Sequence, residues 1–116
     1  MKRGDVVIVD FPYSDGRQDK IRPAVVVQDD RYNQTWSKTV VAMVTGNTKR
    51  RHDPAHLLID PMLEPGTGLK GPSLVSCPNL HTIDQKAIHR KLGELSEPLL
   101  ARLDDCLIEA LGITRV

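Results

Sequence analysis

Aromatic residues are scarce in this sequence, which has one Trp, two Tyr and one Phe among 116 residues. A surface that stacks a long run of nucleobases needs several aromatic rings, so this scarcity excludes an extended stacking platform. Aliphatic side chains, mainly Val, Leu and Ile, must therefore fill the core. An excess of charge of one sign is also absent, because the formal net charge is +1. A nucleic acid partner would have to be held by a local basic patch rather than by a uniformly basic body.

Cysteine is equally sparse, and Cys77 and Cys106 share no close spacing with each other or with a histidine. A disulfide framework or a structural zinc site is thus not expected, and the chain carries no signal peptide pattern, so we expect reduced thiols and a cytoplasmic location. No apolar run approaches the roughly 18 residues that a membrane span needs, so we expect a soluble protein. The length suits one hydrophobic core, and we expect a single domain over residues 1–116.

Short apolar or alternating runs separated by turn residues predict a set of strands. They fall at residues 6–11, 24–28, 39–45, 56–60 and 73–76, with two further short strands at 81–84 and 90–95. Residues 12–20 and 31–38 are polar and predict surface loops, and the basic stretch 47–54 predicts the tip of a hairpin. Asp84 is expected to cap a turn or a single helical turn.

The last part of the chain predicts a helix of about four turns. Ser96 is a good N-cap, Pro98 fits in the first turn, and Gly112 ends the pattern. One face is marked by leucines at helical spacing: Leu99, Leu100, Leu103, Leu107 and Leu111. Several short strands followed by one helix indicate a mainly β (α+β) fold, a small partly open barrel with a C-terminal α-helix packed against it.

Two residues at predicted strand ends are candidates for phosphate binding. Arg22 precedes Pro23, which favours an extended backbone and holds the arginine at the entry of a strand, where a guanidinium can fork onto a phosphate. The alternative is a surface arginine paired with a nearby carboxylate. Thr45 ends an apolar strand just before Gly46, where its hydroxyl can donate to a phosphate oxygen or instead cap the turn.

Other polar residues indicate less. The basic run at residues 49–52 suits either a contact to a polynucleotide backbone or a solvated loop. The four histidines form no ligand spacing and no paired motif, and most of them are expected to be ordinary surface residues: His52, His56, His81 and His89. Ser73 and Ser76 lack the context of a nucleophile elbow, and no glycine-rich phosphate loop or paired carboxylates are present. Serine hydrolase, kinase and dinucleotide-binding functions are not expected.

Three segments together resemble the MazF/PemK family of toxin endoribonucleases. In chain order they read KRGDV at residues 2–6, IRPAVVVQ at 21–28 and VAMVT at 41–45. The resemblance continues through SLV at residues 73–75, HTID at 81–84 and the final helix, so it covers nearly the whole chain.

The resemblance implies an SH3-like barrel, a homodimer and sequence-selective cleavage of single-stranded RNA that is blocked by a cognate antitoxin, with DNA binding in the antitoxin complex. The implied active residues fall on Arg22 and Thr45. In that scheme the ribose 2′-hydroxyl attacks the adjacent phosphate and leaves a 2′,3′-cyclic phosphate and a 5′-hydroxyl. No metal or cofactor is expected, since the protein orients the 2′-oxygen and stabilises charge on the phosphate.

The same resemblance assigns RNA contacts to loops and strand ends around the groove. The expected contacts are Arg17, Gln18, Lys49, Arg50, Ser73 and Asn79. The sequence departs from several relatives at Arg17, where they carry Glu, and at Asn79, which cannot act as a base where some relatives place an acid. The general base therefore stays unnamed.

Two other functions stay open at this point. The chain could be a non-catalytic binding module on the same barrel, including a toxin that clamps a protein target such as a topoisomerase. It could also be a family member that binds RNA or an antitoxin but has lost turnover through the changes at Arg17 and Asn79.

Overall fold

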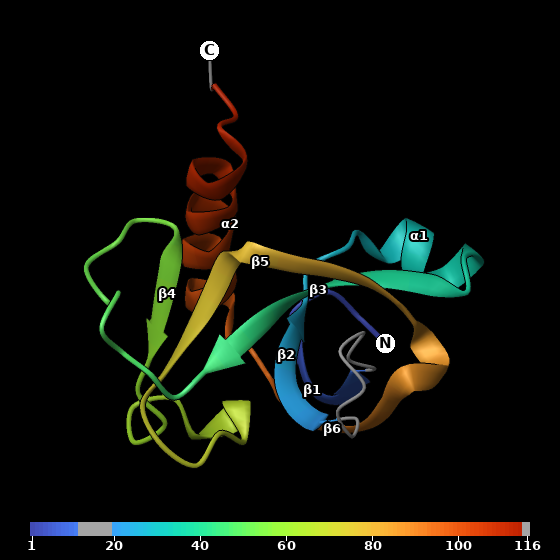
Figure 1. Ribbon diagram of the computed structural model, residues 1–116, viewed down its shortest axis with the longest axis horizontal. Helices are drawn as coiled ribbons and strands as arrows, with labels where there is room; N and C mark the ends of the chain where they lie inside the picture. Colours follow the sequence, from blue (N-terminus) through green and yellow to red (C-terminus); the bar gives the residue numbers. More distant parts are fainter. Residues whose placement is uncertain (12–19, 115–116) are drawn as a thin grey trace.

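The computed structural model describes residues 1–11 and 20–114, and it shows one curved antiparallel sheet with a helix packed at its side (Figure 1). The strands are β1 (Asp5–Phe11), β2 (Lys20–Val26), β3 (Lys38–Thr45), β4 (His56–Ile59), β5 (Ser73–Asp84) and β6 (Ile88–Glu94). The helices are α1 (Asp30–Thr35), α2 (Glu97–Leu111) and the short 3-10 helices η1 (Pro65–Thr67) and η2 (Gln85–Ala87). No helix in the described ranges combines the length and apolar content needed to cross a membrane.

The sheet is open, with the strand order β4-β5-β3-β2-β1-β6 and antiparallel pairing throughout. Strands β4 and β6 are therefore its two edges. The expected class, mainly β with a C-terminal helix, is confirmed.

The predicted hairpin tip at residues 47–54 is wrong, because β4 pairs with β5 and not with β3. The segment after Thr45 passes the end of β5, which lies between β3 and β4, before it enters β4. A connection of this length exceeds the two to five residues of a typical hairpin loop and can span an intervening strand.

Strand β5 joins two segments that the sequence predicts as separate strands. Its register against β3 jumps from the pair Met43 and Ser76 to the pair Ala42 and Leu80, so residues 77–79 have no partners in β3. Pro78 lies within this bulge, where its missing N–H breaks no ladder hydrogen bond with β3. The bulge bends β5 (Figure 1), which lets one strand serve both halves of the sheet.

Helix α1 replaces part of the surface loop expected at residues 31–38. Asp29 caps it, since its Oδ1 accepts a hydrogen bond from the backbone N–H of Arg31 at 2.8 Å. Its buried Asn33 accepts from the Thr39 hydroxyl at 2.7 Å and so ties α1 to β3. The helix is too short to produce a hydrophobic period, which explains why the pattern did not predict it.

The core is aliphatic, as the composition requires, and lies on both faces of the sheet. Alternating residues of β1 to β3 divide between two clusters: Val6, Val25, Ala42 and Val44 on the face that α2 covers, and Val7, Ala24, Val26, Val41 and Met43 on the other.

Helix α2 begins and ends where the sequence predicts. The Ser96 side chain accepts from the backbone N–H of Leu99, and Gly112 closes the helix with φ 67° in the left-handed region. Leu99 and Leu103 are buried, but Leu111 is 57% exposed, which corrects its place in the predicted face. Cys106 lies on the buried face of α2.

Cys106 and Cys77 of β5 are both buried free cysteines. Burial raises the pKa of the Cys77 thiol to about 12, so it packs in the core as a protonated, apolar group.

Candidate functional site

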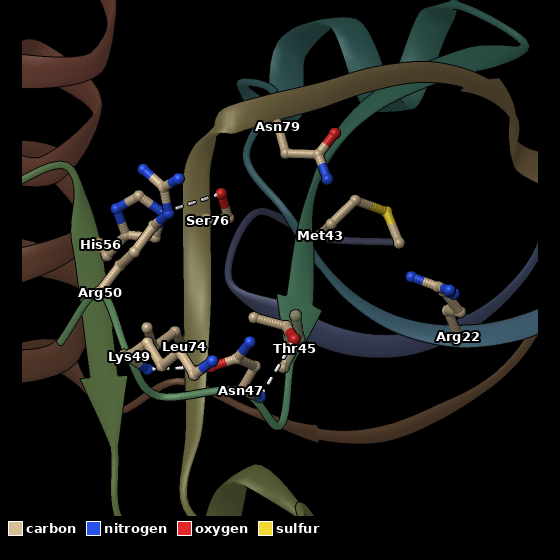
Figure 2. Close-up of a pocket in the computed structure, with 11 residues that line it drawn as sticks. Arg22, Met43, Thr45, Asn47, Lys49, Arg50, His56, Leu74, Ser76 and Asn79 are labelled. Carbon is tan, nitrogen blue, oxygen red and sulfur yellow. Dashed lines mark hydrogen bonds between the residues drawn. The ribbon is translucent and has the colours of Figure 1, made fainter.

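A cavity of about 420 Å³ opens on the face of the sheet opposite α2, near the ends of β2 and β3 (Figure 2). It is lined by Arg22, Met43, Val44, Thr45, Asn47, Lys49, Arg50, His56, Leu74, Ser76 and Asn79. The lining residues come from β2, β3, β4, β5 and the connection after β3.

The strand register explains why these residues meet. Cross-strand pairing places Ala24, Met43, Ser76 and His56 in one row across β2, β3, β5 and β4. Side chains in such a row point to the same face of the sheet, and residues two positions along each strand form the next row on that face. Thr45 and Leu74 pair in that second row.

Arg22 extends the second row onto β2. It lies two residues before Ala24, and Thr45 lies two residues after Met43, which is the β3 partner of Ala24 in this antiparallel pair. The Arg22 side chain is exposed, and Figure 2 shows it on the opposite side of the view from His56, with Thr45 between them. The structure thus brings together the two residues predicted to bind phosphate.

Thr45 already has a structural partner, since its Oγ1 accepts a hydrogen bond from the backbone N–H of Asn47 at 3.1 Å. Asn47 in turn accepts from the backbone N–H of Lys49 at 3.0 Å, and these two turns shape the chain after β3 (Figure 2). An accepting hydroxyl keeps its own hydrogen, so Thr45 can cap the turn and still donate to a ligand in the cavity.

His56 is the exception among the histidines, and the sequence did not single it out as a site residue. It is not an ordinary surface histidine, because its side chain is only 7% exposed and lines the cavity. Its Nε2 lies 3.1 Å from the Ser76 hydroxyl and its Nδ1 lies 3.4 Å from Asp53 Oδ1. The Asp-x-x-His spacing at the start of a strand was visible in the sequence, but the contact with Ser76 depends on the pairing of β4 with β5.

The Asp53 carboxylate beside His56 is held in its charged form. The backbone N–H of Ala55 donates to Asp53 Oδ1 at 2.8 Å, and this hydrogen bond, followed by the contact with His56, lowers the pKa of the carboxyl below its usual value. Asp53 is 41% exposed, so it stands at the outer edge of the site.

Other predicted contacts divide between the cavity and the rest of the chain. Lys49, Arg50 and Asn79 line the cavity, and the Asn79 Oδ1 lies 2.9 Å from His81 Nε2. Ser73 does not line it: its side chain donates to the carbonyl of Gly71 at 2.8 Å and borders a second cavity. The predicted contacts Arg17 and Gln18 lie outside the described residues.

Charge in the cavity has one sign. Arg22, Lys49 and Arg50 line it, and none of its described lining residues is acidic. Three cations around a hydroxyl donor suit an anion with several oxygens, such as a phosphodiester. In the part of the chain that the structure describes, no three His, Cys, Asp or Glu side chains gather as ligands of a metal ion.

Comparison with known proteins gives the same fold. A mycobacterial endoribonuclease in complex with its cognate antitoxin is similar with a TM-score of 0.78 and 22% identity, over 100% of this chain and 99% of that chain. The Mycobacterium tuberculosis toxin MazF-mt6 is similar with a TM-score of 0.77 and 23% identity, over 96% of this chain and 99% of that one. The MazE-MazF complex (Form-III) of Deinococcus radiodurans also reaches 0.77 at 23% identity, over 98% of both chains.

The sequence itself carries the family assignment. The model of the PemK-like, MazF-like toxins of type II toxin-antitoxin systems matches residues 2–111, which is nearly all of the chain. This match agrees with the resemblance that the Arg22 and Thr45 strands carry. The chain therefore belongs to the PemK-like, MazF-like toxin family of type II toxin-antitoxin systems.

Proposed function

We propose that this chain cleaves single-stranded RNA by transesterification without a metal ion. The observation that carries the proposal is the meeting of Arg22 and Thr45 at one cavity with two further cations, Lys49 and Arg50. The endoribonuclease named among the similar structures supports RNA as the substrate class. Action on messenger RNA also implies a cytoplasmic location.

The substrate supplies the nucleophile in this mechanism. The ribose 2′-oxygen attacks the adjacent phosphorus, the bond to the 5′-oxygen breaks, and the products are a 2′,3′-cyclic phosphate and a 5′-hydroxyl. Arg22 forks onto the phosphate oxygens and stabilises the charge that develops on the pentacoordinate phosphorus. Thr45 donates its hydroxyl hydrogen to a phosphate oxygen and fixes the angle of attack.

The remaining cavity residues hold the strand on either side of the scissile phosphate. Lys49 and Arg50 contact the backbone, and the amide of Asn79 offers a donor and an acceptor to a base edge. Arg17 and Gln18, beyond the described residues, and Ser73, outside this cavity, stay predicted RNA contacts.

A protein antitoxin and a second copy of the chain are the proposed partners. Similar structures include a toxin with its cognate antitoxin and a MazE-MazF complex. Size measurement in solution, with and without a co-expressed antitoxin, tests both partners.

The test of this function is incubation of the purified protein with single-stranded RNA in EDTA. Fragments with cyclic phosphate ends are expected, whereas RNA that stays intact, or cleavage that requires Mg²⁺, would contradict the proposal. The Arg22→Ala variant should lose roughly 10² to 10³ in rate, because a preorganised donor to the developing charge is removed.

Arg31→Ala is the matched control, since Arg31 is an exposed arginine of α1 that pairs with Asp29 outside the cavity. A folded Arg22→Ala variant that no longer cleaves RNA but remains toxic would show that toxicity comes from binding a protein target, the topoisomerase type of toxin included. RNA binding without products from the unmodified chain would identify a member that has lost turnover.

A further inference from the structure

One wall of the cavity holds a buried histidine between a carboxylate and a hydroxyl. The side chain of His56 is 7% exposed, while His52, His81 and His89 are all exposed. Burial of an imidazole that keeps polar groups next to both ring nitrogens favours a defined orientation. The roles proposed above for Arg22 and Thr45 do not involve this histidine.

The surroundings of His56 select one tautomer. Asp53 lies 3.4 Å from Nδ1, and because the Ala55 N–H and His56 lower the pKa of its carboxyl, Asp53 is an acceptor at neutral pH. Nδ1 makes no hydrogen bond within the described part of the chain, and the negative carboxylate 3.4 Å away favours a hydrogen rather than a lone pair on Nδ1. Nε2 then carries the lone pair and accepts the hydrogen bond of the Ser76 hydroxyl at 3.1 Å.

This arrangement matches what a general base needs. A base must have a free lone pair within hydrogen-bond reach of the hydroxyl it deprotonates, and a neighbour that stabilises the imidazolium formed. Nε2 has the free lone pair, and the Ser76 hydroxyl shows that a donor can lie within hydrogen-bond reach of it. The Asp53 carboxylate stabilises the imidazolium. Arg22 is excluded from this role because a guanidinium has no acceptor atom in proteins.

We propose that His56 is the general base of RNA cleavage, and this inference rests on the function proposed above. The 2′-hydroxyl of the bound ribose takes the place of the Ser76 hydroxyl at Nε2 and gives its proton to the imidazole. The 2′-oxygen bonds to phosphorus as the phosphorus–O5′ bond breaks. The 5′-oxygen takes a proton from water, and His56 returns its proton to solvent, so the proton count balances.

The position of His56 in the sheet supports a base role for His56 beside phosphate binding by Arg22 and Thr45. Strand β5 separates His56 on β4 from Thr45 on β3, and Arg22 lies farther along the same face on β2 (Figure 2). In this proposal, the ribose that attacks a phosphate held at Arg22 and Thr45 lies on the side of His56. The charged groups near the imidazole are Asp53, 3.4 Å from Nδ1, and Lys49 and Arg50, which line the same cavity.

The decisive measurement is the single-turnover cleavage rate of a short RNA in EDTA across pH, for the unmodified protein and His56→Gln. We expect His56→Gln to lose roughly 10² to 10⁴ in rate and to lose the acid limb of the pH–rate profile, as removal of a general base does. Binding of the same RNA with a 2′-deoxy nucleotide at the cleavage site should change little. His89→Gln is the matched control, an exposed histidine on β6 that lies near Asp10.

The neighbours of His56 give a second test that does not depend on how well His56→Gln folds. Asp53→Asn keeps an acceptor for the Ala55 N–H but removes the charge, so the acid limb should move to lower pH. Ser76→Ala should cost less than about tenfold, the effect of one hydrogen bond, because the substrate hydroxyl replaces it.

The outcomes separate this inference from the proposed function. No cleavage by the unmodified protein in EDTA would overturn both. Cleavage by folded His56→Gln at the unmodified rate, or an acid limb that Asp53→Asn leaves in place, would overturn the role of His56 alone. A loss in Ser76→Ala as large as that in His56→Gln would also overturn it, since the serine would then be the reacting hydroxyl.

Discussion

Thr45 shows how one side chain can serve the fold and the site together. Its Oγ1 accepts from the Asn47 N–H at 3.1 Å, and its hydrogen is left for a donor role toward the cavity. The two alternatives that the sequence left open are compatible, because a hydroxyl accepts and donates through different atoms. Its position at the end of β3 makes both contacts available.

We predict that Thr45→Val slows RNA cleavage by roughly 10- to 150-fold, the worth of a hydrogen bond to a charged group. Val keeps the branched shape at the end of the strand and removes only the hydroxyl. Thr45→Ser is the control, since it retains both the cap to Asn47 and the donor. Equal rates for the two variants in a single-turnover assay would show that the hydroxyl takes no part in the reaction.

Helix α1 is capped by one ionised side chain. Asp29 accepts from the backbone N–H of Arg31 at 2.8 Å and from its side chain Nε at 3.1 Å. The Arg31 side chain is the largest cause that lowers the pKa of the Asp29 carboxyl below its ordinary value. The helix has only six residues, so its cap accounts for much of its local order.

The sign of this pKa shift gives a pH prediction for α1. A carboxyl whose pKa is lower in the folded state stabilises the fold above the unfolded pKa, about pH 4, and this contribution disappears as the pH falls through the folded value. The amide signal of Arg31 in an NMR titration should thus shift at acid pH. The Asp29→Asn variant keeps a capping side chain that does not titrate, so the shift should vanish there. Its persistence would assign the titration to another group.

At the scale of the whole molecule, we expect RNA binding to depend on a local cluster of positive charge rather than on the net charge. The net charge of +1 provides almost no general attraction for RNA, yet Arg22, Lys49 and Arg50 gather at one cavity. Each cation that neutralises a phosphate of a single strand contributes about −0.7 to the slope of log K against log salt. Binding should therefore depend on salt far more strongly than the net charge suggests.

We predict that Lys49→Ala weakens binding of single-stranded RNA and reduces that slope by about 0.7. Lys86→Ala should leave the slope unchanged, since Lys86 is an exposed lysine of η2 outside the cavity. Fluorescence anisotropy with a labelled 2′-deoxy RNA analogue over a range of salt concentrations measures both variants. A slope that is equally reduced by the two changes would mean that binding uses the whole surface.

Much of the fold could be predicted because its signals are local. The caps of α2 at Ser96 and Gly112 and the apolar runs of β1, β2 and β3 depend on neighbouring residues in the chain. The pairing of β4 with β5 could not be predicted in this way, because the residues of a strand do not indicate which strand it pairs with. The sequence also did not predict that β5 continues through Pro78, because the bulge is defined only by the pairing of β5 with β3.

The sequence by itself determined the aliphatic core, the mainly β class, the C-terminal helix and the end of β3 at Thr45. The predicted place of Arg22 before a strand is wrong, because β2 begins at Lys20 and Arg22 pairs with Val9 inside it. Only the tertiary structure decided that His56 lies buried beside Ser76 and that Ser73 lies outside the cavity. The physical reason is register. Side chains alternate faces along a strand, so which residues share a cavity depends on pairing between strands that are distant in the chain.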